Sequence, residues 1–140
     1  MKEQKGEERS SLEGVDEVQL RSMAERLKEM MVFENEHLIV INKDNGVPSQ
    51  MGTGLSLAHN KDISVDKMLE AYIKLSGDGI SEGKLVHRLD RKTSGLLALA
   101  KNKEMAAWLS HLFKERSDSI QKSYFALLCG VPKFKEGLIR

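Results

Sequence analysis

Two short apolar runs, HLIVIN at residues 37–42 and SGLLALAK at residues 94–101, alternate along the chain with segments of helical periodicity. The first run is rich in β-branched residues and is followed by the breaker Asn45-Gly46, so it predicts a buried strand that enters a turn. The second run predicts another buried strand. Since strands and helices alternate within 140 residues, the pattern predicts one globular domain that contains both.

Three segments carry apolar residues at helical spacing, and each predicts an amphipathic helix. The first begins at Asp16, while Ser64 and Asn102 are the expected N-caps of the second and third. Trp108 lies on the apolar side of the third helix, so we expect it in the core. The apolar side of the first helix comprises Val18, Leu20, Met23, Ala24, Leu27, Met30 and Met31.

The rest of the chain divides into a tail, a helix and further strands. Residues 1–14 are polar and charged, and we expect a flexible tail there. Residues 15–31 form a lead-in helix in this interpretation. QKSYFALLCG at residues 121–130 predicts a third buried strand, and residues 138–140 are expected to begin a fourth.

The composition excludes membrane and secreted proteins. The single cysteine, Cys129, cannot close an internal disulfide, which favours a reducing compartment. No apolar run approaches the roughly 20 residues that span a bilayer, and the first residues lack the hydrophobic stretch of a secretory signal. We therefore expect an intracellular protein, cytoplasmic or organellar, with no membrane partner. His59 and Cys129 are too few and too far apart to predict a metal site.

The net charge of +1 conceals a strong asymmetry. Residues 84–140 carry 12 Lys and Arg against 5 Asp and Glu, a net charge of +7, whereas the segments before them are acidic. A basic patch of this kind attracts polyanions such as RNA or DNA. A solvated surface of Lys and Arg explains the same composition, so charge alone leaves the function open.

The most informative segment is HRLDRKTSG at residues 87–95, between two strand-like runs. It combines an acid, an imidazole and several cations in a loop between rigid elements, where active sites are commonly found. A charged surface turn, with Asp90 paired by Arg88 or Arg91, is the alternative. However, the seven specified positions of H-R-L-D-x-x-T-S-G arise by chance at on the order of 10⁻⁹ per starting position.

This motif resembles the signature of the RluA-type RNA pseudouridine synthases. The resemblance extends from about Val32 to Pro132: NKDNGVPSQMGTG is similar to the family's lead-in turn, and QKSYFALLCGVP to its tyrosine-bearing strand. It implies an α+β fold, with a mixed, mainly antiparallel β-sheet core and flanking helices over residues 32–140. It also implies that neither a metal nor another cofactor is used, and that one aspartate, Asp90, is essential.

The reaction that the resemblance implies is the isomerisation of uridine in RNA, either rRNA or tRNA. The bond between ribose C1′ and uracil N1 breaks, the base rotates, and C1′ is rejoined to C5. An ionised Asp90 could act as a base or as a nucleophile, and the sequence does not choose between them. We expect its carboxylate to be shielded from bulk solvent against the sugar of an extruded nucleotide.

The resemblance also assigns roles around Asp90. Arg88 is expected to insert where the flipped base was, and Tyr124 to stack on the uracil as a second catalytic residue. His87, with a role in bracing the loop or in binding phosphate, is grouped with Arg91 and Lys92 as substrate-binding. Lys84, Lys101 and Lys122 are further candidate phosphate contacts. We expect structural support from Thr93 and Ser94 through main-chain hydrogen bonds, and from Gly95 by allowing close approach of the chain.

Two departures from the family pattern favour an alternative. Asp44 stands where the family has proline, and the sequence ends at Arg140 before the family's third motif, which supplies a cation beside the aspartate. We therefore expect residues 32–140 to be a C-terminally incomplete catalytic domain. The alternative is a catalytically inactive RNA-binding or assembly module with the same fold.

Overall fold

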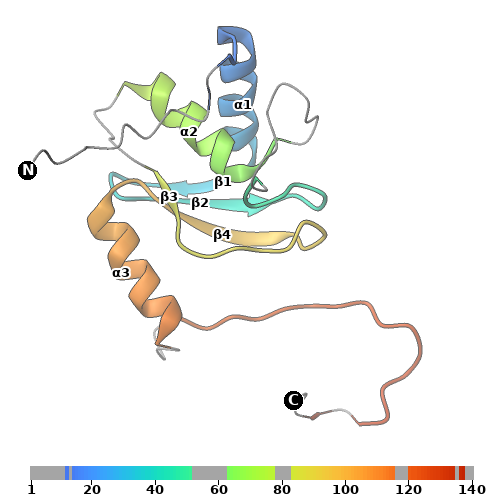
Figure 1. Cartoon of the computed structure of the whole chain (residues 1–140). Coiled ribbons are helices and arrows are strands. Elements are labelled where there is room, and N and C mark those ends of the chain that lie inside the picture. Colours follow the sequence, from blue (N-terminus) through green and yellow to red (C-terminus); the bar gives the residue numbers. More distant parts are fainter. Residues whose placement is uncertain are drawn as a thin grey trace, which may run out of the picture.

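A computed structural model describes residues 12, 14–51, 63–77, 83–115, 120–134 and 136–137. Helices and strands alternate along these residues, as the sequence predicts, and the fold is α+β (Figure 1). The elements are α1 (Glu17–Met30), β1 (Met31–Glu34), β2 (Leu38–Lys43), α2 (Val65–Ser76), β3 (Lys84–Leu85), β4 (Gly95–Ala100) and α3 (Lys103–Lys114).

The strands form one four-stranded sheet in the order β1-β2-β4-β3, and every described pairing is antiparallel. The central pair runs in register from Leu38 opposite Ala100 to Lys43 opposite Gly95. The end of β2 therefore lies beside the start of β4. This register brings the loop after β2 next to the HRLDRKTSG loop, which precedes β4.

Helices α1 and α2 cover one face of the sheet and enclose the core (Figure 1). Burial of apolar surface there is the main source of stability. The opposite face is open near the start of β4, where Leu96 is 65% exposed. α3 contacts the sheet through a small second cluster around Ala100. The fully or nearly fully buried side chains of the main core include Met23, Leu27, Ile39, Ile41, Val65, Met68, Leu69, Leu97 and Leu99.

The helix ends follow the predicted signals. Asp16 caps α1 through a capping box with Gln19, and the Asn102 side chain accepts a hydrogen bond from a main-chain amide in the first turn of α3. Ser64 is the N-cap of α2, although its hydroxyl donates to a nearby carboxylate instead of capping the main chain. Gly77 ends α2 in the left-handed conformation at φ 65°.

Two apolar residues that we expected on buried faces are exposed. Trp108 is 58% exposed, and the core prediction is wrong, because α3 runs obliquely away from the sheet and buries only Ala106 and Leu109 (Figure 1). Val18, in the first turn of α1, is also exposed. Helical spacing identifies an apolar face, but the position of the neighbouring elements decides how much of that face is covered.

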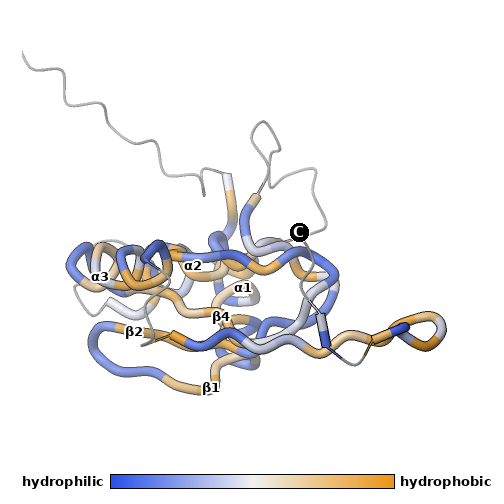
Figure 2. Tube along the Cα trace, turned by 90° about the horizontal axis from the view of Figure 1, so that it is seen from below, coloured by the Kyte–Doolittle hydropathy of each residue, from blue (hydrophilic) through white to orange (hydrophobic). Residues whose placement is uncertain are grey.

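The predicted third strand does not form. Residues 120–134 run extended from the end of α3 without strand pairing, and their hydrophobic part projects beyond the sheet (Figure 2). A strand needs a neighbouring backbone, and no described element lies alongside this segment as a pairing partner. The short strand β1, conversely, was not predicted. Residues 1–11 and 13 of the expected tail at 1–14, the loop with His59 and the fourth strand at 138–140 lie outside the described residues. Leu12 is 3% exposed and belongs to the main core, so the expectation of a flexible tail is wrong at this residue.

Candidate active site

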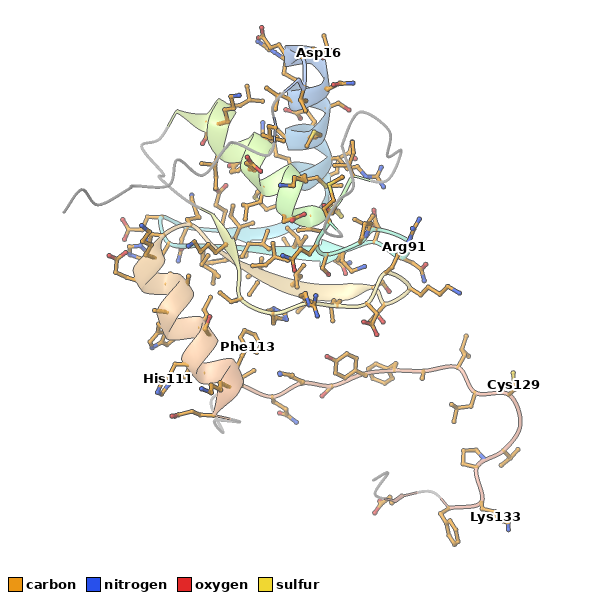
Figure 3. The ribbon with its side chains drawn as sticks, in the orientation of Figure 1. Asp16, Arg91, His111, Phe113, Cys129 and Lys133 are labelled. Carbon is orange, nitrogen blue, oxygen red and sulfur yellow. The ribbon has the colours of Figure 1, made fainter. Side chains whose placement is uncertain are left out.

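The HRLDRKTSG segment connects β3 to β4, and its turn with Arg91 lies at the end of the sheet opposite α3 (Figure 3). Asp90 begins a turn closed by a 2.9 Å hydrogen bond from the main-chain N–H of Thr93 to the Asp90 carbonyl. Gly95 then enters β4 at φ +130°, which favours glycine. A Cβ at Gly95 would meet nothing within 4 Å, so the expected close approach is wrong and the backbone angle is the reason for glycine.

The loop after β2 fastens the Asp90 turn to the sheet. The Gly46 N–H donates to the Arg91 carbonyl at 2.8 Å, and Arg91 Nε donates back to the Gly46 carbonyl at 3.0 Å. Asn45 Nδ2 also donates to the Lys92 carbonyl at 2.9 Å. Three hydrogen bonds therefore hold the two residues that follow Asp90, and they fix where its side chain begins.

Lys43 lies beneath the two loops with its side chain fully buried. Its Nζ donates to the main-chain oxygens of Val47 at 2.8 Å, Asp44 at 3.0 Å and Arg91 at 3.4 Å. Burial lowers the pKa of Lys43, while the negative charges of Asp44 and Asp90 act in the opposite direction. The Asp90 carboxylate therefore has a buried cation as an electrostatic neighbour.

Ser49 holds the residue between Arg88 and Asp90. Its hydroxyl donates to the Leu89 carbonyl at 2.6 Å and accepts from the Leu89 N–H at 3.1 Å. Ser49 is itself buried. One side chain thus satisfies both main-chain groups of Leu89, which restricts rotation of the backbone on either side of it.

His87 braces the start of the loop. Its Nε2 accepts a 2.9 Å hydrogen bond from the main-chain N–H of Ala98 in β4, and its ring stacks on Phe113 of α3 with centroids 4.2 Å apart. Burial lowers the pKa of His87, and the positive charge of Lys122 lowers it further. Of the two roles that we considered, these contacts favour bracing over phosphate binding.

An open hollow of about 820 Å³, the larger hollow, lies between the open sheet face and the segment after α3. Lys92, Thr93 and Ser94 line it from the loop, and Lys122 and Tyr124 from the extended segment. Tyr124 is 68% exposed and its ring is available to a ligand. The structure thus brings Tyr124 and the residues after Asp90 to one hollow, although they are far apart in the sequence.

Comparison with known proteins identifies the family to which this site belongs. The family model for RNA pseudouridylate synthases matches residues 37–140, which include both loops and Tyr124. The chain belongs to the RNA pseudouridylate synthase family. The resemblance to RluA-type synthases is confirmed.

Individual relatives agree with the family model. The chain is 39% identical over 110 residues to ribosomal large subunit pseudouridine synthase C of Rickettsia conorii, which covers 79% of this chain and 32% of the relative. It is 30% identical to the mitochondrial RNA pseudouridine synthase 4 of Arabidopsis thaliana, covering 79% of this chain and 24% of that protein. The solved structure of human RNA pseudouridylate synthase domain containing 4 matches 71% of this chain and 34% of its own length, with 30% identity and a TM-score of 0.55. The chain thus spans about a third of the length of its bacterial relatives.

Asp90 is exposed in this pseudouridylate synthase chain, so the expected shielding from solvent is wrong for the described residues. Asp90 is also not among the residues that line the larger hollow. It sits at the outer end of the sheet, on a turn over which nothing in the described part of the chain packs. Any cover over the carboxylate must come from outside these residues.

The three basic side chains of the motif, Arg88, Arg91 and Lys92, lie in different surroundings. Arg88 is exposed and lines a smaller hollow of about 470 Å³ with Lys84 and Asp66, while Lys92 faces the larger hollow. Arg91 is exposed but bonded to Gly46 through Nε. Among the described residues, no group of three or more His, Cys, Asp or Glu side chains is placed to hold a metal ion.

The structure changes the roles that the sequence predicted for Lys101, Thr93 and Ser94. Lys101 is no phosphate contact: it is 7% exposed and bonds to Glu34 at 2.8 Å. In the described part of the chain, Thr93 supports the turn through its main-chain N–H, and neither its side chain nor that of Ser94 makes the expected hydrogen bond.

Lys43 and Ser49 support the site, but they are not among the site residues predicted from the sequence. Alternation along β2 could have indicated Lys43, since it continues the buried phase of Ile39 and Ile41.

Within the described residues, no helix has the length and apolar character needed to cross a membrane.

Proposed function

We propose that the protein isomerises uridine in RNA to pseudouridine, with Asp90 as the essential carboxylate. The observation that carries this proposal is the pinned geometry of Asp90, with Lys43 buried beneath it and Tyr124 in the adjacent hollow. Membership of the pseudouridylate synthase family supports it. We also propose that residues 32–140 contribute the catalytic part, in a protein that works in the cytoplasm or an organelle.

The reaction is an isomerisation, so its atoms balance without a redox partner. The C1′–N1 bond breaks, C1′ bonds to C5, C5 loses its proton, and N1 gains one. An ionised Asp90 can take a proton from C2′ or attack the sugar or the uracil ring, and both routes need the carboxylate. Tyr124 offers a ring for stacking and a hydroxyl for proton transfer near C5.

RNA as the substrate agrees with the exposed cations. Arg88, Arg91 and Lys92 surround Asp90 on its loop, and each is exposed. Cations in this arrangement bind phosphates and position an RNA strand. Extruding a uridine costs a few kcal/mol, and the guanidinium of Arg88 can stack in the vacated space. A bound RNA would also cover the exposed carboxylate. Ribosomal and transfer RNA are the proposed classes.

The exposure of Asp90 also favours a second candidate, an RNA-binding or assembly module without catalysis. The experiment is to incubate the protein with uridine-containing rRNA and tRNA transcripts, digest them, and separate the nucleosides. Pseudouridine has the mass of uridine but a C–C glycosidic bond, so chromatography and fragmentation distinguish them. Formation of pseudouridine supports the first function. Binding of the same RNA without pseudouridine supports the second and contradicts the first.

A further inference from the structure

The hydrogen bond from Ala98 to His87 lies where the sheet loses its edge strand. β3 pairs with β4 only through Lys84 with Ala100 and Leu85 with Leu99. After Leu85 the chain leaves the sheet, so the Ala98 N–H has no main-chain partner from β3. The His87 Nε2 takes the place of that partner at 2.9 Å. A side chain of the motif thus extends the ladder by one bond.

This hydrogen bond requires a particular form of the imidazole. A ring nitrogen accepts a hydrogen bond only when it carries no proton, so the proton of neutral His87 must be on Nδ1. Protonation would place an N–H opposite the Ala98 N–H. Two donors would then face each other and the bond would be lost. The contact therefore responds to the charge of His87.

The same ring connects two other elements. His87 stacks on Phe113, in the last turn of α3, with an interplanar angle of 27°. Lys122 Nζ lies 4.9 Å from the centroid of the Phe113 ring, and Tyr124 follows two residues later. His87 is thus in contact with β4 and α3, and through Phe113 it is linked to the segment that carries Tyr124. Phe113 lies near the free end of α3, close to where that segment begins (Figure 3).

Burial and the charge of Lys122 favour the neutral form of the ring. Burial disfavours the cation, and the positive charge of Lys122 adds to that effect, so the pKa of His87 lies below its ordinary value of 6.5. Lys84 and Arg88 flank it on its own segment. Lys92 and, from α2, Asp66 share the two hollows that His87 lines. At neutral pH the ring is therefore an uncharged acceptor.

We infer that His87 is a positioning residue: its neutral imidazole holds the Asp90 loop and the Tyr124 segment in one arrangement, and its protonation releases them. The inference rests on the proposed isomerisation. It adds to that function an acid sensitivity that originates in a side chain outside the reaction itself. Turnover should fall about tenfold for each pH unit below the titration of His87, because only the neutral fraction is competent.

The test compares pH profiles of turnover from pH 5 to pH 8.5 for three forms of the full chain. His87→Gln supplies an oxygen acceptor that does not titrate. Its profile should therefore lack the fall in turnover toward acid pH that we assign to protonation of His87. His111→Gln is the matched control: His111 is an exposed histidine on α3, and its replacement should leave the wild-type profile unchanged. A His87→Gln profile identical to that of the wild type would overturn the inference.

A measurement without RNA separates this inference from the proposed function. In ¹⁵N spectra of the free protein, His87 should carry its proton on Nδ1 at pH 8. The Ala98 amide signal should shift with the same midpoint as the His87 ring. A proton on Nε2, or an Ala98 signal that does not follow His87, would overturn the inference whether or not the protein is active. Absence of turnover at every pH, with these signals as expected, would contradict only the isomerase proposal.

Discussion

Lys43 and Arg91 meet across the two loops of the site: the buried Nζ of Lys43 lies 3.4 Å from the main-chain oxygen of Arg91. The same ammonium donates to two carbonyls of its own loop. The buried ammonium of Lys43 therefore connects the loop after β2 to the turn of Asp90. This buried contact adds to the hydrogen bonds by which Asn45 and Gly46 hold the Asp90 turn.

Replacing Lys43 should destabilise the protein. Lys43→Met keeps most of the side-chain volume but leaves main-chain oxygens without their donor, and should lower the free energy of unfolding by about 2–4 kcal/mol. Urea unfolding measures this difference. Lys74→Met, on the exposed side of α2, is the control and should change stability by less than about 0.5 kcal/mol. Equal losses in the two variants would show that Lys43 holds nothing.

Ser49→Ala should affect turnover more than stability. The variant removes the hydroxyl that satisfies both main-chain groups of Leu89, which costs about 1 kcal/mol of unfolding free energy. Since Leu89 lies between Arg88 and Asp90, its added freedom should lower kcat by about tenfold or more. Steady-state kinetics beside thermal unfolding measure both effects. Ser22→Ala, exposed on α1, should alter neither. A kcat within twofold of the wild type would contradict the positioning role of Ser49.

Arg88→Ala should distinguish structured from flexible RNA. If Arg88 replaces an extruded base, its loss should slow turnover roughly tenfold or more on a stem-loop and much less on an unstructured strand, where extrusion costs little. Single-turnover rates on both RNAs provide the comparison. Arg26→Ala removes an exposed arginine of α1 and serves as the charge-matched control. Equal losses on both RNAs would remove base extrusion from the role of Arg88.

Protonation of Glu34 should lower the free energy of unfolding at acid pH. Burial raises its pKa, but hydrogen bonds from Lys101 and Tyr72 outweigh burial, and the pKa in the folded state lies below 4.5. A lowered carboxyl pKa adds stability above the unfolded value of 4.5, and that stability is lost as pH falls through the folded pKa. Glu34→Gln should cost about 0.5–1.5 kcal/mol at pH 7, because solvent screens this exposed carboxylate, and less at pH 3. Thermal unfolding at both pH values measures this, and an equal cost at the two would be the contrary result.

Local patterns predicted most of the fold. β2 and β4 are apolar runs bounded by turn residues, and Asp16 and Asn102 cap their helices through their own side chains, so the signals lie within a few residues. Strand pairing, in contrast, depends on segments that are distant in the sequence. Residues 121–130 have the composition of a strand but no neighbouring backbone in the described structure, and Trp108 is exposed because α3 extends past the sheet.

The site was predictable in its chemistry and less so in its support. The motif predicts roles for Asp90, Arg88 and His87 because their spacing is rare, and those roles remain predictions. The contacts of Ser49 with Leu89 and of His87 with Ala98 join residues 40 and 11 positions apart, and no local pattern encodes such pairs. The exposure of Asp90 was likewise unpredictable, since it depends on what packs over the turn.

The central claim, that the carboxylate of Asp90 performs the isomerisation, is tested most directly with RNA carrying tritium at uridine C5. Joining C1′ to C5 expels that hydrogen, so the wild-type protein should release tritium into water. Asp90→Asn should release none above background, although it still binds the RNA. Asp44→Asn removes another exposed carboxylate that also interacts with Lys43, and it should release tritium at close to the wild-type rate. Release by Asp90→Asn at the rate of Asp44→Asn would contradict the account.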